Sequence, residues 1–136
     1  MKYPHRSKGR LFFADPRDKD RGNRKFWLLM KVDPGIVDFY SWLSLKNGWN
    51  IVRGSRWGPH ISIVSGEKPK NVKLWNSLPG RKYQFNYSID LHHDGTFIWL
   101  PVQSNELEQL RMDLGLTKRP YFNFHMTIGR FKHKVE

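Results

Sequence analysis

The chain contains the tetrapeptide His60-Ile61-Ser62-Ile63 and, near its end, the related tetrapeptide His125-Met126-Thr127-Ile128. Each runs histidine, apolar residue, hydroxyl residue, isoleucine, and the apolar, largely β-branched character of both favours a strand. Successive side chains of a strand point to opposite faces, so the histidine and the hydroxyl of one motif share a face. Two such strands, lying side by side, would bring two imidazoles and two hydroxyls into one groove.

The first motif is preceded by a predicted strand and a predicted helix. Residues 26–32 (FWLLMKV) form a nearly continuous apolar run, which is typical of a buried strand. Asp33-Pro34 then supplies a helix N-cap and a proline at the first helical position. Apolar residues at roughly helical spacing continue to Asn47-Gly48, which predicts a helix over 34–47. A turn-rich segment leads from there to the strand that opens at His60.

The second motif is preceded by elements of the same kind. Residues 83–91 and 96–102 read as two strands joined by a tight turn at His93-Asp94-Gly95. A helix over 104–115 begins at a serine N-cap, carries leucines at helical spacing and ends at a glycine. A final strand over 121–131 carries the motif.

The order of elements therefore indicates an approximate internal duplication, although the residues barely repeat. At 136 residues the chain fits one domain of the mixed α/β (α+β) class. We expect two pseudo-symmetric lobes, about 26–66 and about 81–131, with antiparallel sheets around a central groove. Residues 1–25 hold nine Lys/Arg against three Asp, and we expect a loop-rich basic segment with a strand only over 10–14.

The composition excludes several classes of protein. Without cysteines, the chain has no disulfide scaffold, no thiolate zinc site and no cysteine nucleophile. No segment approaches the roughly 18 consecutive apolar residues of a membrane span, and no apolar region follows the basic N-terminus as in a signal peptide. We therefore expect a cytoplasmic protein, in the host cytoplasm if it is viral, with no membrane partner.

Charge and aromatic content point to an anionic partner. The chain has 24 Lys/Arg and 12 Asp/Glu, a formal net charge of +12. Such a field attracts polyanions and accelerates their capture, although many basic surfaces are merely solvated. Aromatic residues make up 15% of the chain, and aromatic faces beside basic groups are what a base and a phosphate require.

The two motifs together suit phosphodiester chemistry that needs no metal or other cofactor. One neutral histidine can take a proton from a 2′-hydroxyl or from water, while the other, protonated, donates to the leaving oxygen. Ser62 and Thr127 would donate hydrogen bonds to non-bridging phosphate oxygens, whose charge grows in the transition state. A single motif of this type would more often be a hydrogen-bonded histidine of the fold, but two motifs that close similar units favour function.

The other histidines are expected to be structural or solvated. His92-His93 lies in the predicted hairpin turn, where a metal would lack further ligands at suitable spacing. His5 and His133 lie in basic terminal segments.

The motifs at 60–63 and 125–129 resemble the signature of the 2H phosphoesterase superfamily. That family includes RNA 2′,3′-cyclic phosphodiesterases, enzymes that act on 2′-5′ linkages, and phage nucleases that destroy the cyclic oligonucleotide signals of bacterial CBASS immunity. The resemblance implies a pair of α/β lobes around a groove, with His60 and His125 catalytic and Ser62 and Thr127 binding phosphate. The small size, the basic charge and the aromatic content are closest to the phage anti-CBASS nucleases, which are hydrolases used in host defence evasion.

Five further residues are candidates for binding the substrate. Trp57 precedes the first motif and Tyr121 the second, and either could stack on a base, although aromatics in strands more often belong to a core. Trp75 lies in a basic loop (KPKNVKLW), where exposure is expected. Arg130 follows the second motif and could contact a phosphate, and Tyr3 with its basic neighbours could form a lid.

Four functional hypotheses remain open at this point. The first is a nuclease that cleaves 3′-5′ bonds of cyclic oligonucleotides. The second keeps the site but moves the substrate to RNA ends with a 2′,3′-cyclic phosphate, or to 2′-5′ linkages. The third is a non-catalytic basic RNA-binding module with structural histidines, for which the charge and the aromatic residues alone would be sufficient. The fourth is a structural protein of a ribosome or capsid, which also fits the charge but leaves the repeated motif unexplained.

Overall fold

The computed structural model describes residues 2–14, 26–53 and 57–133. Its elements in chain order are β1 (His5–Phe13), β2 (Trp27–Lys31), α1 (Pro34–Lys46), β3 (Ile51–Val52), β4 (His60–Ser65), α2 (Val72–Asn76), β5 (Lys82–Tyr87), β6 (His92–His93), β7 (Phe97–Gln103), α3 (Asn105–Asp113) and β8 (His125–Phe131). Every strand pairing is antiparallel. The predicted α+β class is confirmed.

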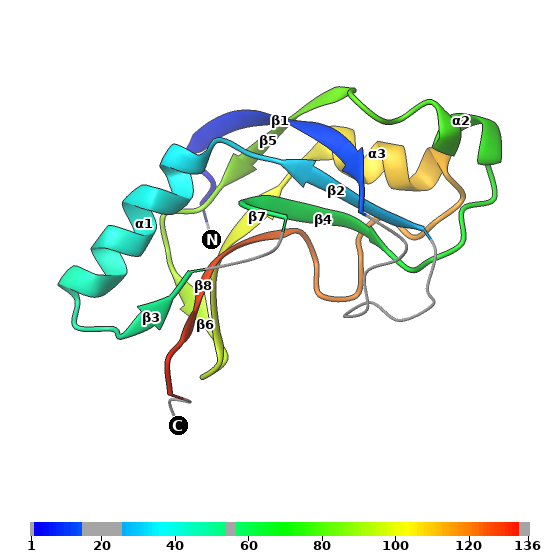
Figure 1. Ribbon diagram of the computed structural model, residues 1–136. Coiled ribbons are helices and arrows are strands. Elements are labelled where there is room, and N and C mark those ends of the chain that lie inside the picture. Colours follow the sequence, from blue (N-terminus) through cyan, green and yellow to red (C-terminus); the bar gives the residue numbers. More distant parts are fainter. Residues whose placement is uncertain (1, 15–25, 54–56, 134–136) are drawn as a thin grey trace.

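Six of the strands close into a barrel. Their order is β8–β4–β2–β1–β5–β7, and β7 pairs again with β8. The two-residue strands β3 and β6 extend the sheet beside β8 and β7. In Figure 1, α1 and α3 lie at opposite ends of this barrel. Closure leaves β4 and β8, the two strands that carry the motifs, as direct neighbours.

The hydrophobic core fills the barrel. Alternate side chains of the strands point inward and are fully buried, among them Met30, Ile61, Leu100 and Met126. Apolar residues of both helices join the same cluster. Since burial of a large aliphatic side chain contributes about 1.5–3 kcal/mol, this shared core is the main term that holds the motif strands in place.

The two main helices have the predicted starts. The Asp33 carboxylate accepts a hydrogen bond from the Gly35 amide at 2.9 Å, and the Ser104 hydroxyl accepts one from the Leu107 amide at 3.1 Å. These contacts satisfy amides that have no partner within the helix. Gly115 follows α3 with φ of 85°, a conformation that favours glycine at a helix end.

The N-terminal segment differs from the prediction. Strand β1 begins at His5 rather than at residue 10, and it lies in the middle of the sheet between β2 and β5. Two positions on its inward face, Ser7 and Gly9, hold small residues, and space is short at Gly9: a Cβ added there would lie 2.6 Å from Cγ of Met30. Because large apolar residues are missing at these two positions, the first half of the strand shows no alternating hydrophobic pattern. The rest of the predicted basic segment, residues 15–25, lies outside the described residues.

Two predicted strand boundaries also require correction. β5 ends at Tyr87, earlier than the predicted residue 91. β8 starts at His125, whereas residues 121–124 lie outside it, because the chain turns there: the Asn123 amide donates to the Pro120 carbonyl at 2.8 Å, and Asn123 has φ of 61°. No helix in the described part of the chain is long and apolar enough to cross a membrane.

Candidate active site

The two motifs lie on adjacent antiparallel strands. Ile61 of β4 pairs with Met126 of β8, and both side chains are buried in the core. Continuing this register by one residue in each direction places His60 opposite Thr127, and Ser62 opposite His125. Because these four residues alternate with the core residues, their side chains share the outer face of the barrel. The two motif strands are therefore direct neighbours, which is the arrangement that the site prediction requires.

The register also sets the spacing of the two imidazoles. In an antiparallel pair, side chains directly opposite have Cβ atoms about 4.5–5.5 Å apart, and diagonal neighbours about 7–8 Å. His60 and His125 are diagonal neighbours, and each stands opposite the hydroxyl residue of the other motif. A phosphate placed at the centre of this group would have an imidazole on two sides and a hydroxyl on the other two.

Both motif strands carry a β-bulge at the same motif position. Relative to β2, the register of β4 shifts by one between Ser62 and Val64, so that Ile63 is the extra residue. Relative to β7, the register of β8 shifts by one between Thr127 and Gly129, so that Ile128 is the extra residue. The isoleucine that ends each tetrapeptide is thus the bulged residue, and the internal duplication extends to this detail of the backbone.

The bulge in β8 brings Arg130 to the face of the histidines. Without an extra residue, the strict alternation that puts Thr127 outside would turn residue 130 into the core. With it, Arg130 is exposed while Ile128 and Gly129 are buried. Arg130 has no ion-pair partner among the described residues, so its guanidinium is available to an anion beside Thr127. The same position in the first motif is occupied by Ser65.

The backbone orients the two imidazoles in the same way. His60 Nδ1 lies 2.7 Å from the carbonyl oxygen of Gly58, and His125 Nδ1 lies 3.1 Å from that of Asn123. Both carbonyls belong to the residue two positions earlier, and both of these residues have positive φ, 71° and 61°. A glycine and an asparagine adopt this conformation more readily than other residues.

These contacts fix the protonation pattern of each ring. A carbonyl oxygen can only accept, so Nδ1 carries the proton and donates it. In the neutral ring the lone pair is then on Nε2, and in the protonated ring Nε2 carries the second proton. The same atom, Nε2, can therefore accept a proton in one state and donate one in the other.

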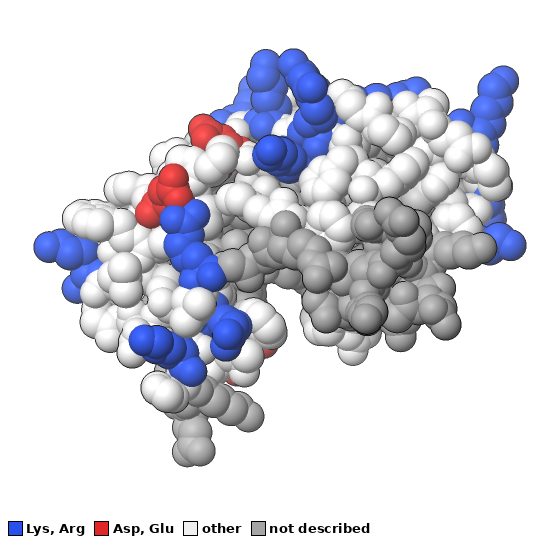
Figure 2. Space-filling model, viewed as in Figure 1, with Lys and Arg blue, Asp and Glu red and all other residues white. Residues whose placement is uncertain are grey.

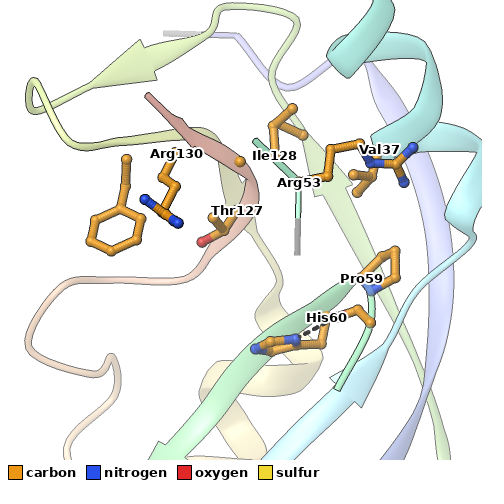
Figure 3. A pocket seen from close by; sticks show the side chains of 10 residues that line it. Val37, Arg53, Pro59, His60, Thr127, Ile128 and Arg130 are labelled. Atoms are coloured by element: carbon orange, nitrogen blue, oxygen red, sulfur yellow. Dashed lines mark hydrogen bonds between the residues drawn. The ribbon is translucent and has the colours of Figure 1, made fainter. Parts of the chain in front are cut away.

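A pocket of about 390 Å³ opens at this face. Its wall includes His60 and the loop before it, together with β8 from Thr127 to Arg130, and its other lining residues are Val37, Arg53 and Phe97. In Figure 3 the His60 imidazole and the Thr127 hydroxyl project toward the same space, with Arg130 beside Thr127. Arg53 is ion-paired with Asp38 and is thereby held at the rim.

The remaining predicted binding residues have different positions. Trp57 is half-buried, and its ring centroid lies 6.3 Å from that of Phe12 on β1. Tyr121 is 94% exposed in the turn before β8 and packs edge-on against Phe122. Tyr3 precedes β1, and its carbonyl accepts a hydrogen bond from the Asn86 side chain at 3.3 Å. The pocket wall includes none of these three.

Trp75 was expected to be exposed, and this is wrong. The side chain is only 7% exposed and belongs to the core cluster. Its ring stacks on Phe13 with centroids 4.8 Å apart and meets the edge of Phe26 at 5.7 Å. The charged neighbours in its segment lie on the outer side of the short helix α2, and the apolar partners come from distant parts of the chain.

Sequence reasoning missed two residues beside the histidines. Trp99 of β7 pairs with Thr127, is half-buried, and lies with its ring centroid 6.2 Å from that of His125. Lys31 of β2 pairs with His60 and is exposed. The alternation of β7 puts Trp99 on the outer face, but only the strand order places it beside the second motif.

A buried arginine supports the first motif from within the molecule. Arg111 of α3 is fully buried and donates to the carbonyl of Ile63, the bulged residue of β4, at 2.8 Å. It also makes a bidentate ion pair with Glu67, at 2.9 and 2.6 Å, and donates to the Thr117 carbonyl. The hydrogen bond from Arg111 lowers the pKa of the Glu67 carboxyl. Arg111 therefore holds the bulge from the second half of the chain.

The described residues contain no group of three or more His, Cys, Asp or Glu side chains that could hold a metal ion. The chain matches no known protein-family model, and no curated protein or solved structure is significantly similar to it.

Proposed function

We propose that the protein is a metal-independent phosphodiesterase of the 2H type, a hydrolase with His60 and His125 as the acid/base pair. The observation that carries the proposal is the pairing of the motif strands, which puts each histidine opposite the hydroxyl residue of the other motif. The matched contacts at Nδ1 support it, because they direct equivalent ring nitrogens for proton transfer.

We also propose that the repeated units are the two lobes of this fold. Support comes from their shared order of strand, capped helix and bulged motif strand, and from the antiparallel pairing of the motif strands, which is compatible with a pseudo-twofold axis between them. On this interpretation the groove between the lobes is the face that carries the histidines, and the pocket beside His60 is part of it.

The reaction we propose is transesterification followed by release. One neutral imidazole removes the proton of a ribose 2′-hydroxyl, and the 2′-oxygen attacks the adjacent phosphorus. The bond from phosphorus to the 5′-oxygen breaks, and the other, protonated imidazole donates its proton to that oxygen. The new chain ends are a 2′,3′-cyclic phosphate and a 5′-hydroxyl. The two histidines have exchanged protonation states, and proton exchange with water restores them before the next turnover.

The hydroxyls and Arg130 would stabilise the charge that develops on phosphorus. Ser62 and Thr127 would donate to the two non-bridging oxygens, and donors aimed at such charge contribute about 10²–10³ in rate. The exposed Arg130 guanidinium would add a charged donor at the pocket wall.

We propose cyclic oligonucleotide immune signals as the substrates, so that the protein would be a viral anti-CBASS nuclease. The net charge of +12 and the half-buried Trp99 beside His125 support a ligand with phosphates and bases. RNA ends with a 2′,3′-cyclic phosphate or a 2′-5′ linkage use the same chemistry and are the substrates to test next.

The test is cleavage of a panel of cyclic dinucleotides and trinucleotides in excess EDTA. We expect the wild type to cleave 3′-5′ bonds, the H60A/H125A variant to be inactive, and the matched H5A/H133A variant to be as active as the wild type. A 2′-deoxy analogue should resist cleavage, because it lacks the attacking hydroxyl.

Other outcomes would point elsewhere. Activity only on linear RNA with 2′,3′-cyclic or 2′-5′ bonds would keep the site but replace the substrate. No cleavage of any of these, combined with salt-sensitive binding to long RNA that survives H60A/H125A, would favour the basic RNA-binding module instead.

A further inference from the structure

A second hollow lies on the outer face of the barrel, beside the candidate active site. Its volume is about 440 Å³, and its lining residues are Lys8, Gly9, Arg10, Lys31, Val32 and Lys82. Four of these six residues are cationic and none is acidic. Figure 2 shows a dense group of basic side chains over the region of β1 and β2. We call this group of residues the basic hollow.

The sheet register connects the basic hollow to the first catalytic histidine. Lys31 pairs with His60, Arg10 pairs with Lys31, and Lys82 pairs with Arg10. All four side chains therefore point to the same face and follow one row across β4, β2, β1 and β5. With neighbouring strands about 4.7–4.9 Å apart, Arg10 stands roughly 10 Å and Lys82 roughly 14 Å from the strand of His60.

These cations have no partners in the part of the chain that the structure describes. No side-chain hydrogen bond or ion pair is formed there by Lys8, Arg10, Lys31 or Lys82. In contrast, carboxylate partners are present for Arg53, Arg111 and Arg119. Like charges directly opposite each other on a sheet destabilise the pairing. A row of three such residues is therefore a cost to folding, which a bound anion would offset.

We infer that the basic hollow is a second phosphate subsite, so that the preferred ligand is a nucleotide chain with at least two phosphates. The inference rests on the proposed function for the first phosphate, which lies between the histidines. That phosphate cannot also occupy the basic hollow, because Arg10 and Lys82 stand two and three strands away from β4. Lys31, next to His60, lies between the two phosphates and can contact either.

Binding of uncleavable ligands tests the inference. The deoxydinucleotide d(ApA) has one phosphate and no 2′-hydroxyl, and d(pApA) and d(ApAp) carry a second phosphate at the 5′ or the 3′ end. By calorimetry with the wild type, we expect at least one of the two longer ligands to bind about tenfold or more tightly than d(ApA). Its affinity should also fall more steeply with salt, the logarithmic slope being larger by about 0.7.

Two variants of equal charge separate the basic hollow from general electrostatics. R10Q/K82Q removes two cations of the hollow, and we expect it to bind the one-phosphate and two-phosphate ligands with equal affinity. K46Q/K73Q removes two exposed lysines of α1 and α2 and should keep the wild-type preference.

The other possible results distinguish a failure of the proposed subsite from a failure of the proposed phosphodiesterase activity. No preference in the wild type, an unchanged preference in R10Q/K82Q, or an equal loss in K46Q/K73Q would each overturn the subsite. A preference that only R10Q/K82Q abolishes, in a protein that cleaves no phosphodiester, would establish the subsite and refute the proposed activity.

Discussion

At the level of single residues, His60 and His125 have matching backbone partners, and the proposed mechanism gives them opposite protonation states. Catalysis by one neutral and one protonated group slows both when the acid loses its proton and when the base gains one. We therefore expect kcat/KM on the best cyclic dinucleotide to follow a bell-shaped pH profile. H60A and H125A should each lower kcat/KM by about 10²–10⁴, and the double variant little further, because the pair acts as a unit. A profile that stays flat from pH 5 to pH 9 would contradict the acid/base assignment.

Substitutions of Thr127 test the role of a single hydroxyl in binding the phosphate. Its side chain is exposed at the pocket wall, opposite His60, so a change there should leave the core intact. Thr127→Val keeps the shape but removes the donor, and we expect kcat to fall by about 10²–10³. Thr127→Ser keeps the donor and should retain most of the activity. Steady-state kinetics of the two variants decide the point, and equal activity in both would mean that the hydroxyl does not contact the phosphate.

At the level of elements, the bulge in β4 depends on α3. Arg111→Met would leave the buried Ile63 carbonyl without its donor and remove the ion pair to Glu67. We expect the free energy of unfolding to fall by about 1–3 kcal/mol, the cost of a buried acceptor left without its donor, measured by urea denaturation at pH 7. The exposed Arg81 provides the control, since its side chain bonds only Ser77 among the described residues: Arg81→Met should cost at most about 1 kcal/mol.

The loss of stability caused by Arg111→Met should depend on pH. Arg111 lowers the pKa of Glu67 in the folded protein below its ordinary value of 4.5, so the contribution of the pair to stability is present above that value and is lost as the pH falls through the folded pKa. The stability difference between the wild type and Arg111→Met should therefore be largest above about pH 5 and should narrow in acid. A difference that stays constant down to pH 3 would show that the pair contributes no pH-dependent stability.

Elements with local signals could be predicted from the sequence, and elements defined by distant partners could not. Asp33 and Ser104 cap their helices with groups two and three residues away, so both helix starts were found. The first half of strand β1 was missed, because Ser7 and Gly9 on its inward face are small and Met30 fills the space at Gly9. The burial of Trp75 was not predicted either, because the rings that cover it, Phe13 and Phe26, lie far from it in the sequence.

At the scale of the whole molecule, the site is a product of barrel closure. The four motif residues were identifiable from their types and spacing, and their common face follows from alternation in each strand. The strand order and the bulges are what bring Trp99, Lys31 and Arg130 beside these four residues, and neither can be read from the motifs themselves. A one-residue change of register in β8 would turn His125 and Thr127 inward, so the catalytic proposal depends on every pairing around the ring.

This dependence predicts that the two repeated units cannot fold separately. β1 pairs with β2 of the first unit and with β5 of the second, and the helices of both units contribute to one core. Fragments 26–66 and 81–131, the boundaries that the repeat suggests, lack β1 and leave the edges of β2 and β5 unpaired. We expect each fragment to give an unfolded proton–nitrogen correlation spectrum, alone and in an equimolar mixture, whereas the full chain gives a dispersed spectrum and unfolds in a single transition. The matched comparison is a mixture of 1–66 with 67–136, which restores β1 and should recover part of the dispersion. A dispersed spectrum from either short fragment alone would show that the units are independent lobes, and the shared core would then be secondary to the core of each.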